Sequence, residues 1–302
     1  MAKIAVISDV HANKVALELV LKDIEKRNVD KIICLGDLVA KYYYPRETVD
    51  AIRSNCSLVI KGNCDDIVAN DNRYKFARQK LGLEGIEYLD NLPISKKTVI
   101  NKVPVSFYHA NPFDLVTLFN PLFDNSNDNK PFLRDEDYTK MFKGTGISIV
   151  GHTHNNFIGQ EENNKIKIVR SASSKDNSEL YIDGETRTII NCGSAGEHNS
   201  VLEQDPLLGP RPIVDPFLTY ALIDTTGLEK GFKVSIIYVP YKEGLIKVYF
   251  DSTDRQVNEV NFPYSPMDTK KLADSISRCN TDPDLEEEIG NRYKKVMELR
   301  RN

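Results

Sequence analysis

The first 65 residues alternate short apolar runs with amphipathic segments, and this pattern narrows the possible fold more than any other feature. Residues 3–8, 30–35 and 56–61 are apolar and rich in β-branched side chains. Because they show no polar alternation, they are typical of strands covered on both faces. Residues 14–27 and 45–53 predict helices, the first with Val15, Leu19 and Leu21 or Ile24 at helical spacing and the second opened by a proline. The order strand, helix, strand, helix, strand predicts parallel pairing in an α/β fold.

The rest of the chain is less regular, and we predict its elements from shorter patterns. The expected elements are a helix at 71–88, a strand pair at 98–108 broken by Pro104, a strand at 147–150, hairpins at 157–190, strands at 220–223 and 233–239, and a charged helix at 284–301. No repeat or low-complexity linker is present. We therefore expect one domain over residues 1–251, with insertions near 111–143 and 157–190 that shape a pocket, and a C-terminal extension over 252–302.

Composition excludes several classes of function. The net charge of -4 over 302 residues argues against a surface that coats nucleic acid. There is no apolar run of membrane-spanning length and no secretory signal, so no membrane association is expected. The five cysteines are odd in number and scattered, which suits reduced thiols and a cytoplasmic location.

Potential metal ligands follow nearly every predicted strand. They are Asp9 and His11 after the first strand, Asp37 after the second, Asn63 after the third, His109 after a fourth, and His152 and His154 after a fifth. Four of the five histidines in the chain occupy these strand ends. In open α/β sheets the carboxyl ends of the strands form the ligand-binding crevice, so the seven side chains should converge there.

Each of these residues has an ordinary structural alternative. A single Asp or Asn after a strand is usually a turn former or a helix cap, and a single His is more often a hydrogen-bonded structural residue than a ligand. All seven would need such an explanation at once, which favours a metal site. Carboxylate, amide and imidazole ligands together suit manganese, iron, zinc, nickel or cobalt better than magnesium or calcium.

At these residues the sequence resembles the calcineurin-like metallophosphoesterase superfamily. Its five blocks occur in order as Asp9-Val10-His11, Gly36-Asp37, Gly62-Asn63, His109 and Gly151-His152-Thr153-His154. The match is strongest to the small bacterial and archaeal phosphodiesterase and diadenosine-polyphosphatase-like branch, with KGNCDD and a Gly-Ser loop at 191–196 as further shared segments. The resemblance implies a four-layer αββα sandwich of two mixed β-sheets flanked by helices, with the metal site at the carboxyl ends of the strands.

The resemblance also implies a role for each ligand. Asp9, His11 and His154 would bind one divalent ion, whereas Asn63, His109 and His152 would bind the other, with Asp37 bridging both. Two such ions, with manganese favoured, would hold a bridging hydroxide that attacks the phosphorus. Asp37, Asn63 and His109 are accordingly expected to be catalytic, and Asn63 is expected to contact substrate as well.

Four positions bear on the leaving group and the substrate. The family usually places a histidine after the Gly-Asn pair as the general acid, but this chain has Cys64, whose thiol is a poorer match to neutral pH. His198, next to the Gly-Ser loop, is a candidate replacement acid, although an exposed loop histidine is the alternative. Arg46 and Arg211 are candidate contacts for substrate phosphate, as bidentate donors.

These observations predict an enzyme, a metal-dependent phosphoesterase that hydrolyses a phosphodiester or a nucleotide phosphoanhydride. The expected partner is a small-molecule phosphate ester or a dinucleotide, and the sequence leaves a homo-oligomer open. One alternative is a protein Ser/Thr phosphatase of the same superfamily, although that branch usually reads GDxVDRG and GNHE where this chain has Gly36–Lys41 and Gly62–Asp65. The other alternative is a metal-binding scaffold protein without turnover.

Overall fold

A computed structural model describes most of the chain up to residue 241. The described residues are 2–42, 44–72, 74–115, 142, 146–163, 165–171, 178–197 and 217–241, together with the backbone of four strands between 202 and 261. The expected helix at 284–301 and most of the expected loop at 111–143 lie outside these residues. Within the described residues no helix is long and apolar enough to span a membrane.

The first sheet has six strands in the order β3-β2-β1-β13-β14-β9. Its parallel half contains β1 (Lys3–Ile7), β2 (Lys31–Cys34) and β3 (Leu58–Val59), the three strands predicted from the first 65 residues. β13 (Phe217–Asp224) pairs antiparallel with β1, and β14 (Phe232–Pro240) and β9 (Leu180–Ile182) complete the sheet. The sheet is therefore mixed, and the carboxyl ends of its three parallel strands lie on the same side.

The second sheet also has six strands, in the order β4-β5-β6-β10-β7-β8. Its centre is parallel: β5 (Val103–Tyr108), β6 (Ile147–Val150) and β10 (Thr188–Asn191). Antiparallel pairing extends this centre at both edges. β4 (Ser95–Ile100) pairs with β5 at one edge, and β7 (Phe157–Glu162) and β8 (Lys165–Ser171) follow β10 at the other. The segment 157–190 thus supplies strands to both sheets, and its expected role beside a pocket stays a prediction.

The turn between β4 and β5 differs from the sequence-based expectation. Asn101 and Lys102 form it, with φ of 42° and 70°. Two consecutive positive φ values are the geometry of a tight hairpin whose twist matches that of its strands. Pro104, expected to break the pair, instead lies within β5 opposite Val99.

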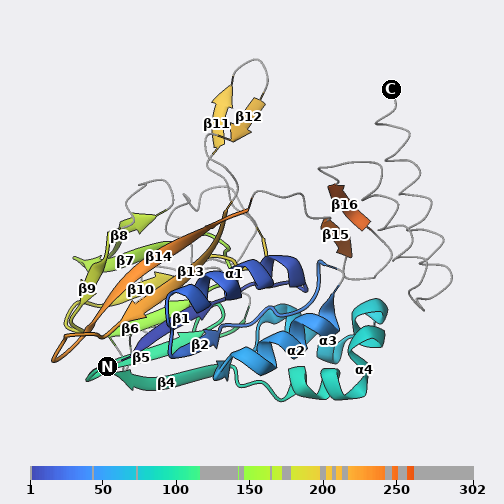
Figure 1. Cartoon of the computed structure of the whole chain (residues 1–302), viewed down its shortest axis with the longest axis horizontal. Coiled ribbons are helices and arrows are strands. Elements are labelled where there is room, and N and C mark those ends of the chain that lie inside the picture. The colour runs from blue at the N-terminus through green and yellow to red at the C-terminus, as the bar shows by residue number, and fades with distance from the viewer. Residues whose placement is uncertain are drawn as a thin grey trace.

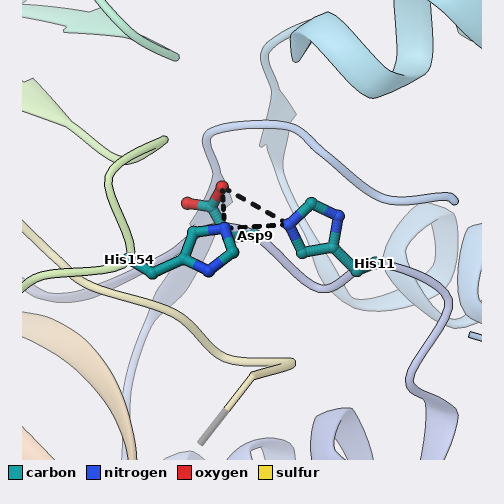
Figure 2. A group of neighbouring side chains, drawn as sticks. All are labelled: Asp9, His11 and His154. Carbon is teal, nitrogen blue, oxygen red and sulfur yellow. Dashed lines mark hydrogen bonds and ion pairs between the residues drawn. The ribbon is translucent and has the colours of Figure 1, made fainter. Parts of the chain in front are cut away.

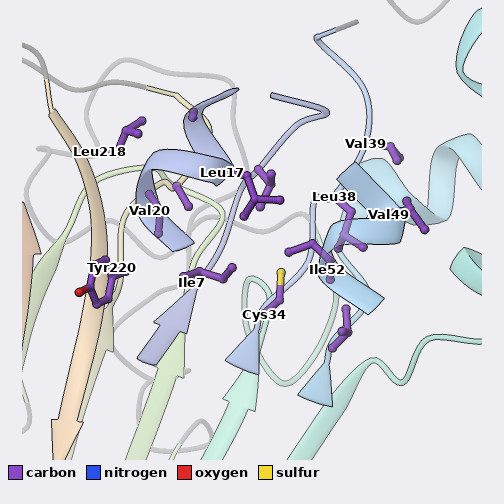
Figure 3. Close-up of a cluster of buried hydrophobic side chains, with 14 of the residues drawn as sticks. Ile7, Leu17, Val20, Cys34, Leu38, Val39, Val49, Ile52, Leu218 and Tyr220 are labelled. Atoms are coloured by element: carbon purple, nitrogen blue, oxygen red, sulfur yellow. The ribbon is translucent and has the colours of Figure 1, made fainter. Parts of the chain in front are cut away.

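Four described helices share one apolar core with the first sheet. They are α1 (Lys14–Lys26), α2 (Pro45–Asn55), α3 (Asn63–Asn70) and α4 (Lys75–Asp90). Figure 1 shows α1 and α2 beside this sheet, and Figure 3 shows Leu17, Val20 and Ile52 from the two helices packed over Ile7 and Cys34 of the strands. Because this core holds the helices against the strands, it also holds the ends of the loops that connect them.

Only part of the apolar pattern predicted for α1 packs on the sheet: Ile24 is buried and Leu21 is partly buried. Its buried residues are Ala16, Leu17, Val20 and Ile24, whereas Val15 and Leu19 are each more than a third exposed. The buried set spans two helical turns at spacings of three and four, so it forms a single stripe over the sheet. Val15 and Leu19 lie on the flank of that stripe.

A second core lies between the two sheets and makes the fold a sandwich. Val6 and Ile33 of the first sheet and Phe107, Ile149 and Ile190 of the second belong to this core and are almost completely buried. The described residues therefore show helices, the first sheet and the second sheet as three layers, in the arrangement of the metallophosphoesterase sandwich. A fourth layer of helices on the outer face of the second sheet stays a prediction for residues that are not described.

Two short hairpins complete the described backbone. β11 (Leu202–Asp205) pairs with β12 (Gly209–Pro212), and β15 (Lys247–Phe250) pairs with β16 (Val257–Asn261). β16 lies inside the expected C-terminal extension. Neither hairpin joins the two large sheets.

Candidate metal centre

The candidate ligands lie on loops that leave the carboxyl ends of parallel strands in both sheets. Asp9 and His11 follow β1, Asp37 follows β2, and Asn63 begins α3 after β3; His109 follows β5, and His152 and His154 follow β6. The sandwich brings these two sets of strand ends together. Three mutually close ligand groups result. Two combine residues from both sheets, namely Asp9, His11 and His154, and Asp37, His109 and His152; the third is His11, Asp37 and Cys64.

Five of the seven candidates have a backbone in the left-handed region. Their φ values are 56° for Asp9, 52° for His11, 53° for Asp37, 67° for His152 and 59° for His154. This conformation is uncommon for residues other than glycine, and such residues gather at functional sites, where the surrounding structure holds them. Here hydrogen bonds hold two of them, because the Asp9 and His11 amides donate to the carbonyl groups of Gly36 and Asp37.

The first cluster consists of Asp9, His11 and His154. Figure 2 shows the two imidazole rings and the carboxylate directed toward one another. The Nε2 atoms of the two histidines are 2.9 Å apart, and Oδ1 of Asp9 lies 3.3 Å from Nε2 of His154 and 3.8 Å from Nε2 of His11. Asp9 and His11 are almost completely buried, so their polar atoms depend on partners inside the protein.

The second cluster consists of Asn63, His109 and His152, with the rings of the two histidines 4.9 Å apart. His109 donates from Nδ1 to the carbonyl of Leu35 over 2.8 Å, so in the neutral ring Nε2 carries a lone pair. That Nε2 atom lies 3.0 Å from Oδ1 of Asn63, which is also an acceptor. Two acceptors directed at one another require a cation or a proton between them.

Asp37 lies between the two clusters. Its Oδ1 atom is 3.4 Å from Nε2 of His109, and its Oδ2 atom is 3.8 Å from Nε2 of His11. The backbone amide of Cys64 donates to Oδ1 over 2.8 Å and fixes the carboxylate. One side chain thus has an oxygen directed toward each cluster.

The electrostatics of the site favour bound cations. Burial alone would raise the pKa of Asp9, but His154, His109 and His11 outweigh burial and hold that pKa well below its ordinary value. Burial lowers the pKa of His11 to about 3, so its ring is neutral and can act as a ligand. For His154 burial is outweighed mainly by the Asp9 carboxylate, and the pKa rises to about 9.

The residues therefore fit divalent cations. Oδ1 of Asp9 is buried and accepts no well-aligned hydrogen bond, and the acceptors of Asn63 and His109 converge on the same space. Buried polar atoms normally have partners, and a metal ion supplies one for each of these. Oxygen and imidazole donors are also a chemically suitable set.

Asp65 and Asn13 position the loops of the site. The buried Asp65 carboxylate accepts from the amides of Leu38 and Gly62 over 2.8 and 2.9 Å, which ties together the loops after β2 and β3. Asn13 caps α1 by accepting from the amide of Ala16 and donates to the carbonyl of Gly196 over 2.6 Å. Both side chains hold together loops that carry candidate ligands, as polar groups behind a metal site commonly do.

The structure describes only one of the three remaining candidate side chains from the sequence, that of Arg46. Arg46 is not brought together with the ligands: its guanidinium donates to Asp50 over 2.9 Å, and to Glu84 and the carbonyl of Leu81 on α4. These contacts hold α2 against α4. His198 and the side chain of Arg211 lie outside the described residues, so their expected roles stay predictions.

Sequence reasoning missed one acidic residue, Glu197. It follows the Gly-Ser loop, which hydrogen bonds from Ala195 and Gly196 to the carbonyl groups of Ser8 and Asp9 hold beside the ligands that follow β1. Oε2 of Glu197 lies 2.6 Å from Nδ1 of His154, and Oε1 lies 3.4 Å from Nζ of Lys41. An acid directly beside that loop was the signal available in the sequence.

A sandwich of two mixed sheets with Asp and His clusters at its strand ends defines a metal-dependent phosphoesterase. The family model of calcineurin-like phosphoesterases matches residues 2–179. An uncharacterised protein of Methanocaldococcus jannaschii is 30% identical over 249 residues, which cover 79% of this chain and 87% of the relative. The chain belongs to the calcineurin-like phosphoesterase family and is a hydrolase acting on phosphoester bonds.

Two solved structures agree with this fold. A metallophosphoesterase from Sphaerobacter thermophilus is 26% identical, with a TM-score of 0.56 over 80% of this chain and 89% of its own. A hypothetical protein from Pyrococcus horikoshii is 20% identical, with a TM-score of 0.53 over 80% of this chain and 90% of its own. The second likeness concerns the fold alone.

Proposed function

We propose that the protein holds two divalent cations, with manganese favoured, and hydrolyses a phosphodiester or a nucleotide phosphoanhydride. The position of Asp37 carries this proposal, because its two oxygens are directed at Nε2 of His109 and at Nε2 of His11. A site for one ion needs three or four ligands, whereas six of the candidates fall in mutually close groups and Asn63 contacts His109.

The ligands divide into two sets around Asp37. Asp9, His11 and His154 would hold one ion, and Asn63, His109 and His152 the other. When bound, a pair of such ions supplies Lewis acidity toward the phosphoryl group and an activated water. The protein groups keep their donor atoms directed inward: Leu35 fixes the ring of His109, and the amide of Cys64 fixes the carboxylate of Asp37.

We assign no protein nucleophile to the reaction. Burial and the nearby Asp37 carboxylate raise the pKa of Cys64 well above its ordinary value, so the side chain is a neutral thiol at physiological pH. A neutral thiol is a weak nucleophile and a weak general acid. Substrates whose leaving group departs without protonation are therefore favoured, which is why we propose activated diesters or phosphoanhydrides.

A substrate panel in the presence of manganese tests this proposal. We expect hydrolysis of bis(p-nitrophenyl) phosphate and of dinucleoside polyphosphates, little release of phosphate from alkyl monoesters or from a phosphoserine peptide, and loss of activity in a chelator. Faster turnover of the phosphopeptide than of every diester would instead favour a protein phosphatase. Manganese binding without turnover of any compound would contradict the proposed reaction.

A further inference from the structure

Glu197 is held beside the proposed metal site by contacts of its own backbone and loop. Ser194 donates from Oγ to the carbonyl of Asp9 over 2.8 Å and accepts from the amide of Glu197 over 2.8 Å. Gly196 lies directly against the carbonyl of Val10, where any side chain would overlap the backbone. None of these contacts uses the side chain of Glu197, so the carboxylate is not needed to place the loop.

The carboxylate of Glu197 binds two groups from other loops. Oε2 lies 2.6 Å from Nδ1 of His154, and Oε1 lies 3.4 Å from Nζ of Lys41. The side chain is 14% exposed, whereas that of Lys41 is 31% exposed. The contact with His154 is the shorter and more buried of the two, so we expect it to be the stronger interaction of the carboxylate.

The contact fixes the chemistry of the His154 ring. A carboxylate accepts only, so Nδ1 of His154 must carry the proton. When Nδ1 is the donor, the lone pair of the neutral ring lies on Nε2, the atom that lies 3.3 Å from Oδ1 of Asp9 and 2.9 Å from Nε2 of His11. Carboxylates that receive the second N–H of a metal-bound histidine orient the ring and increase its basicity.

We propose that Glu197 is a positioning residue for the metal ion held by Asp9, His11 and His154, acting through the hydrogen bond to Nδ1 of His154. The inference rests on the proposed two-metal function. It adds an eighth residue to the site, one that does not itself bind metal. Lys41, on the loop after β2, forms an ion pair with the other oxygen of the carboxylate.

Manganese binding to the metal-free protein tests this role without a substrate. The variants are Glu197→Ala, which removes the acceptor, and Glu197→Gln, which keeps an oxygen acceptor of nearly the same shape. Glu185→Ala is the matched control, because Glu185 is exposed and makes only a surface ion pair with Lys230. Calorimetric titration with MnCl₂ gives the affinity at each site, and thermal unfolding of the metal-free variants reports on the fold.

We expect Glu197→Ala to weaken one of the two manganese sites by about 10–100-fold, the range seen for such outer partners. The other site and the unfolding temperature of the metal-free protein should stay unchanged, and Glu197→Gln should recover most of the lost affinity. Unchanged binding in Glu197→Ala would overturn the inference, as would equal damage in Glu197→Gln and Glu197→Ala. If the native chain binds one ion only, the two-metal proposal fails, and the comparison of Glu197→Ala with native protein still decides the role of Glu197.

Discussion

Single residues at the site combine a rare backbone conformation with a polar side chain. Asp9, His11 and Asp37 each have a φ above 50°, which tolerates Asp and His better than branched or bulky residues. The same conformation turns the chain sharply after β1 and β2, so consecutive ligands face the same space. Residue type and backbone geometry are therefore selected together at these positions.

The residue most open to a direct chemical test is Cys64. Because its pKa is raised by burial, the thiol should protonate a departing oxygen poorly. We predict that the rate of diester hydrolysis depends steeply on the pKa of the leaving group. In Cys64→His the dependence should flatten, with alkyl esters gaining part of the roughly 10²–10⁴-fold that general acid catalysis provides.

A series of aryl and alkyl diesters measures this dependence. Cys64→Ser is the control for size and should keep the steep dependence. A flat dependence in the native chain that becomes steep in His198→Ala would show that His198 is the acid and would contradict our view that the reaction proceeds largely without one.

The candidate ligands could be located in the sequence because they follow recognisable strands. Asp9, Asp37 and His109 could be placed from the apolar runs before them. Glu197 could not, because its role depends on a loop folding back over the residues after β1, a contact between positions far apart in the chain. The contacts of Arg46 could not be foreseen for a similar reason: Glu84, its ion-pair partner on α4, lies 38 residues away.

The candidate ligands follow the ends of strands, so the strands determine where the site lies. Close packing of the loops after these strands determines how far apart the ligands are. Gly62 lies between β3 and α3, and a Cβ atom there would overlap the backbone nitrogen and Oδ1 of Asp37. The absence of a side chain at position 62 thus allows the loops after β2 and β3 to approach. A glycine in this block is required by space and not by its φ of -93°.

We predict that Gly62→Ala displaces Asp37. The variant should lose manganese affinity and about 1–3 kcal/mol of unfolding free energy, the usual cost of overpacking. Gly227→Ala is the control, because its Cβ would meet open space and the change carries only the cost of a positive φ. Metal analysis of the two variants measures bound manganese, and chemical denaturation measures the free energy of unfolding. Normal manganese binding by Gly62→Ala would show that the loops after β2 and β3 accommodate a methyl group without displacing Asp37.

The elements themselves were predicted unevenly. β6 was found with its bounds, and the helices α1 and α2 within a residue or two, because periodicity and a helix-opening proline mark them. α3 was not expected, since its eight residues are too short for a clear helical period. The apolar pattern of α1 was only partly a guide to its buried residues: Ile24 is buried, whereas Val15 and Leu19 are exposed, because apolar side chains also lie on the flank of the buried stripe.

At the scale of the whole molecule, the two sheets bring together ligands that no single sheet could collect. Periodicity identified strands but could not assign them to sheets, because β13 pairs with β1 across more than 200 residues of chain. The sandwich itself was expected only from the resemblance carried by the five sequence blocks. Its consequence is that Asp9 of one sheet and His154 of the other lie 3.3 Å apart.

The central claim, two metal ions bridged by Asp37, is tested most directly by counting manganese ions bound per chain. Equilibrium dialysis followed by elemental analysis should give two ions for the native protein and for Asp66→Asn, a control whose carboxylate pairs with Lys61 outside the site. Asp37→Asn should lose affinity at both sites, because one oxygen is directed at each cluster. Saturation of the native protein at one ion per chain, or loss of a single ion in Asp37→Asn, would contradict the account.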